Sequence, residues 1–112
     1  MITFAVKLDE DRIQKYWARS GLPEVFESVG LSSKHHALKR NEESPEDYEL
    51  CQSVLGLSDT HYMEVITVLA GVQDRYFAVT YKDRGAVGKN YSYAFVFQLE
   101  DEHKGVMLKL AL

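Results

Sequence analysis

The sequence predicts an α+β domain in which an antiparallel sheet of about five strands carries two to three helices, from residues 9–56, on one face. Three observations predict this class. Residues 91–99 alternate aromatic or leucine side chains with smaller or more polar ones, which is the two-residue period of a strand. The same period occurs at the start of the chain and after residue 60. Between these regions, residues 9–56 carry the caps and the apolar spacing of helices.

The size and composition indicate a single domain, 1–112, in the cytoplasm. A chain of 112 residues is long enough for one compact core and leaves little room for a second. Cys51 is the only cysteine, so an intramolecular disulfide is excluded. We find neither a secretory signal nor an apolar run of membrane-spanning length, so no membrane partner is expected. A net charge of −4 disfavours direct binding of nucleic acid through a basic surface.

The first quarter of the chain predicts a strand followed by two helices. Residues 2–8 have an apolar side chain at every even position, as in a half-buried strand. Asp9 stands at the N-cap position of a helix that runs to about residue 20, and its apolar residues are spaced three and four apart. A second, short helix is expected at 23–29, because it begins with a proline and is followed by Gly30.

A polar connection and a third helix come next. Residues 32–43 show neither the period of a helix nor that of a strand. Ser44 can cap a helix whose first position is Pro45 and whose first turn is acidic. Apolar residues then recur at helical spacing until Gly56, so we expect a helix over 44–56.

The second half of the chain predicts a meander of four strands. The two-residue period covers residues 60–69, 76–81, 90–100 and 106–112. Short connections separate these segments, and short connections join antiparallel neighbours. The strand at the start of the chain can complete the sheet at one edge.

The aromatic row of residues 91–99 is expected to face the helices, which leaves the opposite face of the sheet to be explained. That face would combine apolar side chains with several polar ones; the apolar members are Ile66, Val68, Ala78, Ala94, Val96, Met107 and Ala111. Two explanations are open: a self-association or partner surface, or a strongly coiled sheet that covers part of its own back.

The residue types used in catalysis and metal binding form no convincing constellation. Cys51 lies on the apolar stripe of the third predicted helix, where a free cysteine is usually a buried small hydrophobe. The four histidines, His35, His36, His61 and His103, do not have the spacing of zinc ligands. We therefore predict no catalytic residue, no metal and no cofactor.

Acidic residues are the most distinctive polar feature. Glu42, Glu43, Glu46, Asp47 and Glu49 place five carboxylates within eight residues around the start of the third predicted helix. Acidic side chains gather at helix N-termini because the helix dipole favours them there, which accounts for part of this cluster. A complementary basic surface on a partner would also account for it.

Tyrosines are the second candidate for partner contact. Tyr62 and Tyr76 are expected to point away from the aromatic row, and tyrosine is enriched at the energetic centres of protein interfaces. The predicted partner-binding residues are therefore these two tyrosines and the five carboxylates.

The predicted function is that of a small non-catalytic binding protein. An inhibitor fits best, either the immunity protein (antitoxin) of a toxin or a phage-type inhibitor, which would occlude a basic site on a protein such as a nuclease. One alternative is an enzyme or ligand-binding protein whose pocket between helices and sheet uses some of Tyr16, Tyr48, His61 and Tyr81. Another is a structural protein that forms a homodimer through the sheet.

Overall fold

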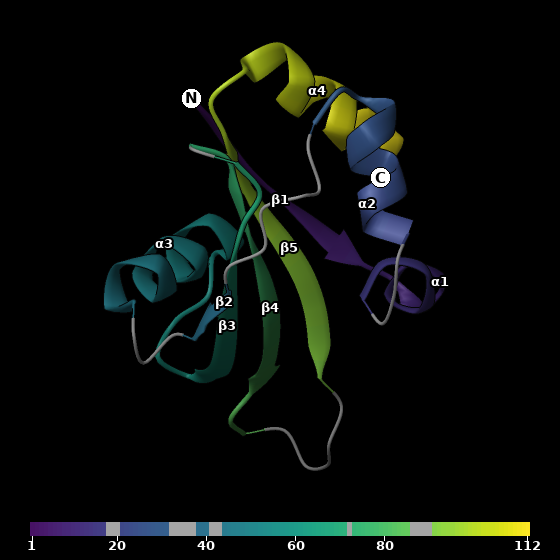
Figure 1. Cartoon of the computed structure of the whole chain (residues 1–112). Coiled ribbons are helices and arrows are strands. Elements are labelled where there is room, and N and C mark those ends of the chain that lie inside the picture. Colours follow the sequence, from purple (N-terminus) through teal and green to yellow (C-terminus); the bar gives the residue numbers. More distant parts are fainter. Residues whose placement is uncertain (18–20, 32–37, 41–43, 72, 86–90) are drawn as a thin grey trace.

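Five antiparallel strands form a single sheet in the order β1-β5-β4-β3-β2. The computed structural model describes residues 1–17, 21–31, 38–40, 44–71, 73–85 and 91–112. The strands are β1 (Ile2–Leu8), β2 (Leu38–Arg40), β3 (His61–Leu69), β4 (Arg75–Asp83) and β5 (Ser92–Leu99) (Figure 1). β1 lies at one edge and pairs with β5, and the three-residue β2 forms the other edge.

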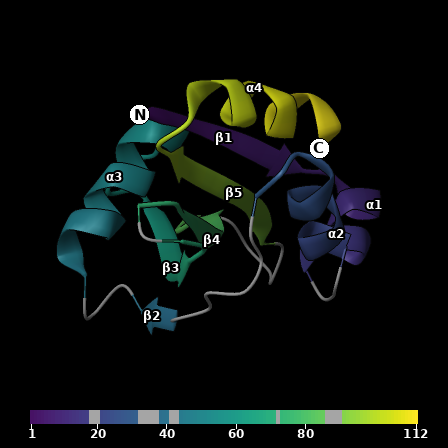
Figure 2. The same ribbon diagram turned by 45° about the horizontal axis from the view of Figure 1, so that its top comes forward.

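Helices cover both faces of this sheet. They are α1 (Glu10–Arg12), which continues into the π-helical turn η1 (Ile13–Trp17), α2 (Gly21–Ser28), α3 (Pro45–Leu55) and α4 (Glu102–Ala111). In Figure 2, α3 lies to the left of the strands and α1 and α2 lie to the right, with α4 above β1; the buried residues of α2 and α4 belong to one core and those of α3 to another. No helix in the described ranges is both long enough and apolar enough to cross a bilayer.

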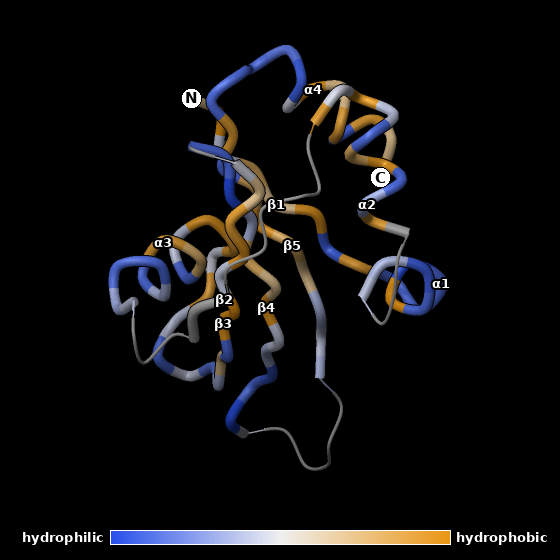
Figure 3. The backbone as a smooth tube through the Cα atoms, in the orientation of Figure 1, coloured by the Kyte–Doolittle hydropathy of each residue, from blue (hydrophilic) through white to orange (hydrophobic). Residues whose placement is uncertain are grey.

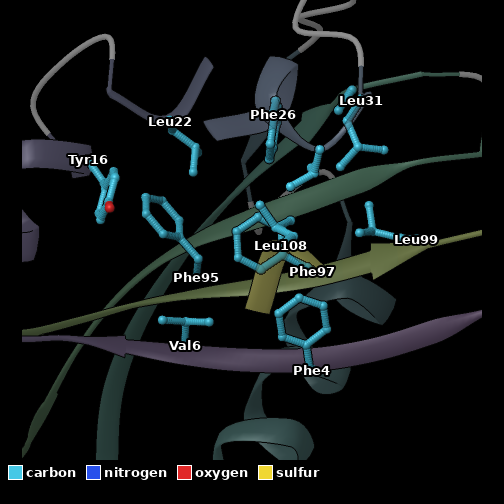
Figure 4. Close-up of a cluster of buried hydrophobic side chains, with 12 residues drawn as sticks. Phe4, Val6, Tyr16, Leu22, Phe26, Leu31, Phe95, Phe97, Leu99 and Leu108 are labelled. Carbon is cyan, nitrogen blue, oxygen red and sulfur yellow. The ribbon is translucent and has the colours of Figure 1, made fainter. Parts of the chain in front are cut away.

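The first core lies between the aromatic row of β5 and the helices α2 and α4 (Figure 4). Phe95 and Phe97 stand opposite Val6 and Phe4 of β1, and the rings of Phe4 and Phe97 stack with centroids 5.2 Å apart. Phe26 of α2 meets Phe97 edge-on at 6.2 Å. Figure 3 shows the same distribution, with hydrophobic residues along the strands and hydrophilic ones at the far end of β4 and in the turn before α4.

The second core lies on the opposite face, under α3. Cys51 and Leu55 of α3 pack against β3 and β4, where Val65, Phe77 and Val79 are fully buried. Ala94 and Val96 of β5 point into this core as well. Because each face of β5 is covered, its buried residues 94–97 are apolar on both sides, and the sheet has no uncovered back at β5.

The α+β class with an antiparallel sheet is confirmed, but the last element is wrong. The sequence predicts a strand at 106–112, but residues 106–111 belong to α4 and Leu112 is its C-cap. Asp101 caps this helix, and its carboxylate accepts hydrogen bonds from the backbone N–H groups of His103 (2.9 Å) and Lys104 (3.3 Å). The place beside β5 that a last strand would have taken is occupied by β1.

The placement of the helices on one face is also wrong, because α3 covers the other. The expected orientation of β3 and β4 fails for the same reason. Ile66 pairs with Ala78, which pairs with Phe95, so these three side chains share the aromatic face. Strands buried on both faces carry apolar residues at odd and even positions, so alternation alone does not tell which set faces which core.

Several local predictions are confirmed. Asp9 caps the first helix and accepts a hydrogen bond from the Arg12 N–H at 2.9 Å. Gly56 ends α3 in the left-handed conformation at φ 68°, which glycine adopts without strain. Ser44 precedes α3, but its side chain makes no capping hydrogen bond.

Candidate functional site

The acidic side chains of α3 divide between its two faces. Glu46 and Glu49, three residues apart on the helix, are exposed on the outer face. Asp47 is only 6% exposed, and it lies on the buried stripe with Cys51 and Leu55. No lysine or arginine occurs within α3. Glu42 and Glu43 lie outside the described residues. The outer face of α3 is therefore acidic, and Asp47 does not belong to it.

Asp47 joins α3 to the sheet through a polar network. Its Oδ1 accepts a hydrogen bond from Nη1 of Arg75 at 2.9 Å, and its Oδ2 accepts one from the buried hydroxyl of Thr67 at 3.0 Å. Nε of Arg75 donates to Oε1 of Gln98 at 2.6 Å. The guanidinium also lies 5.1 Å from the centroid of the Phe77 ring. These contacts fix the start of α3 against β3, β4 and β5.

A half-open hollow of about 420 Å³ adjoins this network, between the start of α3 and the ends of β3 and β4. Its walls are formed by Ser44, Pro45, Glu46, Asp47, Thr67, Leu69 and Arg75. A second hollow, of about 360 Å³, shares Leu69 and Arg75 with the first. Within the described parts of the chain, Arg75 donates to Asp47 and Gln98 only, and an arginine has five N–H groups. Glu46 and Asp47 line the same hollow, so two carboxylates offset the single guanidinium there.

Cys51 is chemically quiet. It is fully buried under α3, and burial, together with the nearby Asp47 carboxylate, raises the pKa of the thiol to about 12 against a partly opposing effect of Arg75. The thiolate is the reactive form of cysteine, so a nucleophilic role does not fit this position. The expectation of a buried small hydrophobe agrees with the place that Cys51 takes in the second core.

We expect the free energy of unfolding to depend on pH through the raised pKa of Cys51. The folded pKa lies above the usual 9.0, so the unfolded chain loses its thiol proton first as the pH rises. The thiol's contribution is therefore complete below pH 9 and falls as the pH rises toward 12. Urea unfolding of a Cys51→Ala variant between pH 9 and 10.5 should show a shallower decline, by up to about 1.4 kcal/mol per pH unit. Identical slopes in the two proteins would contradict the assignment. Burial also raises the pKa of Tyr76, but this tyrosine is present in both proteins and therefore does not contribute to the difference between their slopes.

Tyr62 and Tyr76 differ in their surroundings. The sequence predicts that both point away from the aromatic row, and this prediction is wrong for both. Tyr76 is half-buried, with its ring centroid 5.5 Å from that of Phe26 and 5.8 Å from those of Phe95 and Phe97. Tyr62 is 44% exposed and meets Tyr91 edge-on at 6.5 Å. The Tyr62 side chain is therefore accessible for contact with a partner, whereas Tyr76 belongs mainly to the first core.

The other candidate residues are not brought together. Tyr16 is buried in the first core, and Tyr48 packs beside the second. Neither of them, nor His61 or Tyr81, lines either hollow. Of the residues that the structure describes, no group of three or more His, Cys, Asp or Glu side chains is placed to hold a metal ion. His35 and His36 lie outside the described residues.

One feature of the sequence, the position of Asp47, indicates the polar network. Asp47 precedes Cys51 and Leu55 at intervals of four, so it lies on an otherwise apolar helical stripe. A carboxylate on such a stripe requires a buried partner. Nothing in the sequence indicates that Arg75 is that partner, because the two residues meet only through the pairing of the strands.

Comparisons of this chain with protein-family models, with curated proteins and with solved structures find no match.

Proposed function

We propose that the protein is a non-catalytic inhibitor that covers a basic site on another protein, in the manner of a toxin's immunity protein or a phage-type inhibitor. The observation that carries the proposal is the outer face of α3. Glu46 and Glu49 are exposed there, the helix contains no basic residue, and neither carboxylate forms an ion pair with any described residue. Glu42 and Glu43 precede this face directly in the sequence.

Two physical properties of this face favour protein recognition. A surface that carries only negative charges steers a basic partner into contact and disfavours acidic partners. The helix that carries them is also firmly seated, because Cys51, Leu55 and the Asp47–Arg75 ion pair attach its inner side to the sheet. A surface that is already ordered loses little conformational freedom on binding.

A matched pair of variants tests this proposal. Glu46→Gln/Glu49→Gln removes the exposed charges of α3, and Glu24→Gln/Glu27→Gln removes two exposed charges of the same spacing on α2. Both variants change the net charge equally. Each protein and the wild type would be immobilised and used to capture partners from the source cells at low and high salt.

We expect the wild type and the α2 variant to capture one stoichiometric partner at low salt. The α3 variant should bind it with an association rate at least about tenfold lower, because steering by charge acts mainly on association. The purified partner should lose its own activity when one equivalent of the protein is added. Equal capture by both variants, an uninhibited partner, or no partner that depends on α3 would contradict the proposal.

A further inference from the structure

The C-terminal helix α4 has apolar side chains on both of its sides. On the inner side, Leu108 is fully buried in the first core. On the outer side, Val106, Met107 and Leu110 are 48%, 39% and 82% exposed. These three residues are called the outer face of α4 below. They are the majority of the large hydrophobic side chains exposed in the described part of the chain.

This exposure has no explanation within the fold. A surface helix normally has one apolar stripe, toward the core, and polar residues on the opposite side. α4 cannot turn to bury its outer face instead. A Cβ atom at Gly105 would run into the side chain of Ile2, so the helix lies directly on β1 with its glycine inward. The outer face is therefore held toward solvent.

The charges that flank the outer face are arranged for pairing with an identical helix. Glu102 lies in the first turn of α4 and Lys109 in the last turn. They are seven residues apart, which is close to two full turns, so both lie along the same edge of the outer face. In an antiparallel pair of such helices, each Glu102 meets Lys109 of the other copy. In a parallel pair related by a two-fold axis, the charged edges of the two copies lie on opposite sides, so Glu102 and Lys109 do not meet across it.

The contacts that these two side chains make within the chain are weak. The carboxylate of Glu102 lies 3.8 Å from the Met1 ammonium group, and its side chain is 74% exposed. Nζ of Lys109 lies 6.0 Å from the centroid of the Phe4 ring. An exposed ion pair contributes little in water, and a cation–π contact at an exposed site is also weak. Neither contact therefore keeps these side chains from turning toward a second copy.

We propose that the outer face of α4 docks a second copy of this chain, with the two α4 helices antiparallel about a two-fold axis. Val106 and Met107 lie near the axis, and Leu110 of each copy packs beside the first turn of the other. An isologous contact of this type uses the same patch twice and closes on itself. The dimer leaves the acidic face of α3 free, because α3 packs on the core of one face of the sheet and Leu108 of α4 on the core of the other.

Analytical ultracentrifugation of the full chain over a range of concentrations tests the dimer. We expect the wild type to show a monomer–dimer equilibrium. Leu110→Glu should leave only the monomer, because it places two carboxylates in the apolar contact. The matched control is Tyr62→Glu, which introduces the same charge at a side chain that is also exposed but lies on β3, and it should dimerise like the wild type.

A charge exchange tests the antiparallel arrangement separately. Lys109→Glu should weaken the dimer about tenfold, because it turns two opposite-charge contacts across the axis into two like-charge contacts, and Glu102→Lys should do the same. The combined Glu102→Lys/Lys109→Glu variant restores opposite charges across the axis, and its dissociation constant should return to within about threefold of the wild type. Circular dichroism would confirm that each variant is folded.

Three results would overturn the proposal. They are a wild type that stays monomeric up to millimolar concentration, a dimer that is insensitive to Leu110→Glu, and a combined charge variant that is no tighter than its two parents.

Discussion

Replacing Phe97 by alanine should lower the free energy of unfolding by about 3–5 kcal/mol, which is the range for deleting a buried aromatic ring. Phe97 is fully buried, and its ring lies within 6.2 Å of those of Phe4, Phe26, Tyr76 and Phe95, measured between centroids. These rings come from three strands and α2, so a cavity at this point cannot be closed by moving one side chain. Urea unfolding followed by circular dichroism measures the loss.

The control for this prediction is Phe97→Leu, which keeps most of the buried volume and should cost clearly less than the alanine variant. It also provides a measurable unfolding transition if the alanine variant is largely unfolded, since small domains have only about 5–15 kcal/mol of stability in total. A loss below about 1 kcal/mol for Phe97→Ala would show that the aromatic row does not form the core described above.

Removing the guanidinium of Arg75 should have the second large effect. In the Arg75→Met variant the Asp47 carboxylate stays buried without its cationic partner, a change that typically costs about 3–5 kcal/mol. We expect the lower end of this range, because the side chain of Arg75 is 32% exposed and water screens part of the interaction. The free energy of unfolding in urea is again the measurement.

A double-mutant cycle distinguishes loss of the ion pair from loss of packing. Asp47→Leu alone removes the acceptor of the Thr67 hydroxyl and leaves Arg75 without its carboxylate. In Asp47→Leu/Arg75→Met both charges are gone, and apolar replacements of a buried pair are often close to neutral. The double variant should therefore be more stable than the sum of the single losses implies. Additive losses would mean that the two residues contribute independently.

The elements that could be predicted from the sequence are those with both a period and an end signal. Asp9 and Gly56 mark ends that local hydrogen bonding and backbone conformation determine, so they were found without the tertiary structure. Residues 106–112 show the limit of periodicity. Leu108 and Leu112 are four residues apart, as are Val106 and Leu110, so the same residues fit a strand and a helix with two apolar sides. Asp101 was the deciding signal, because its carboxylate caps the helix.

The candidate site could be predicted only in part. The density of acidic residues near α3 is visible in the sequence, but which of them is exposed depends on how the helix is rotated over the sheet. Asp47 faces inward because Thr67 and Arg75 donate hydrogen bonds to its carboxylate, and those two residues lie on different strands. Contacts of this kind depend on strand pairing between distant segments, which single-sequence periods do not encode.

The pairing of β1 with β5 has a consequence for synthesis on the ribosome. Ile2, near the start of the chain, bonds to a strand whose last residue is Leu99. At about 5–20 residues per second, β1 waits roughly 5–20 seconds for β5, its neighbour in the described part of the sheet. During that interval its apolar side chains and unpaired edge are open to wrong associations. A chaperone that binds short extended apolar segments would therefore be most useful while the residues between β1 and β5 are being synthesised.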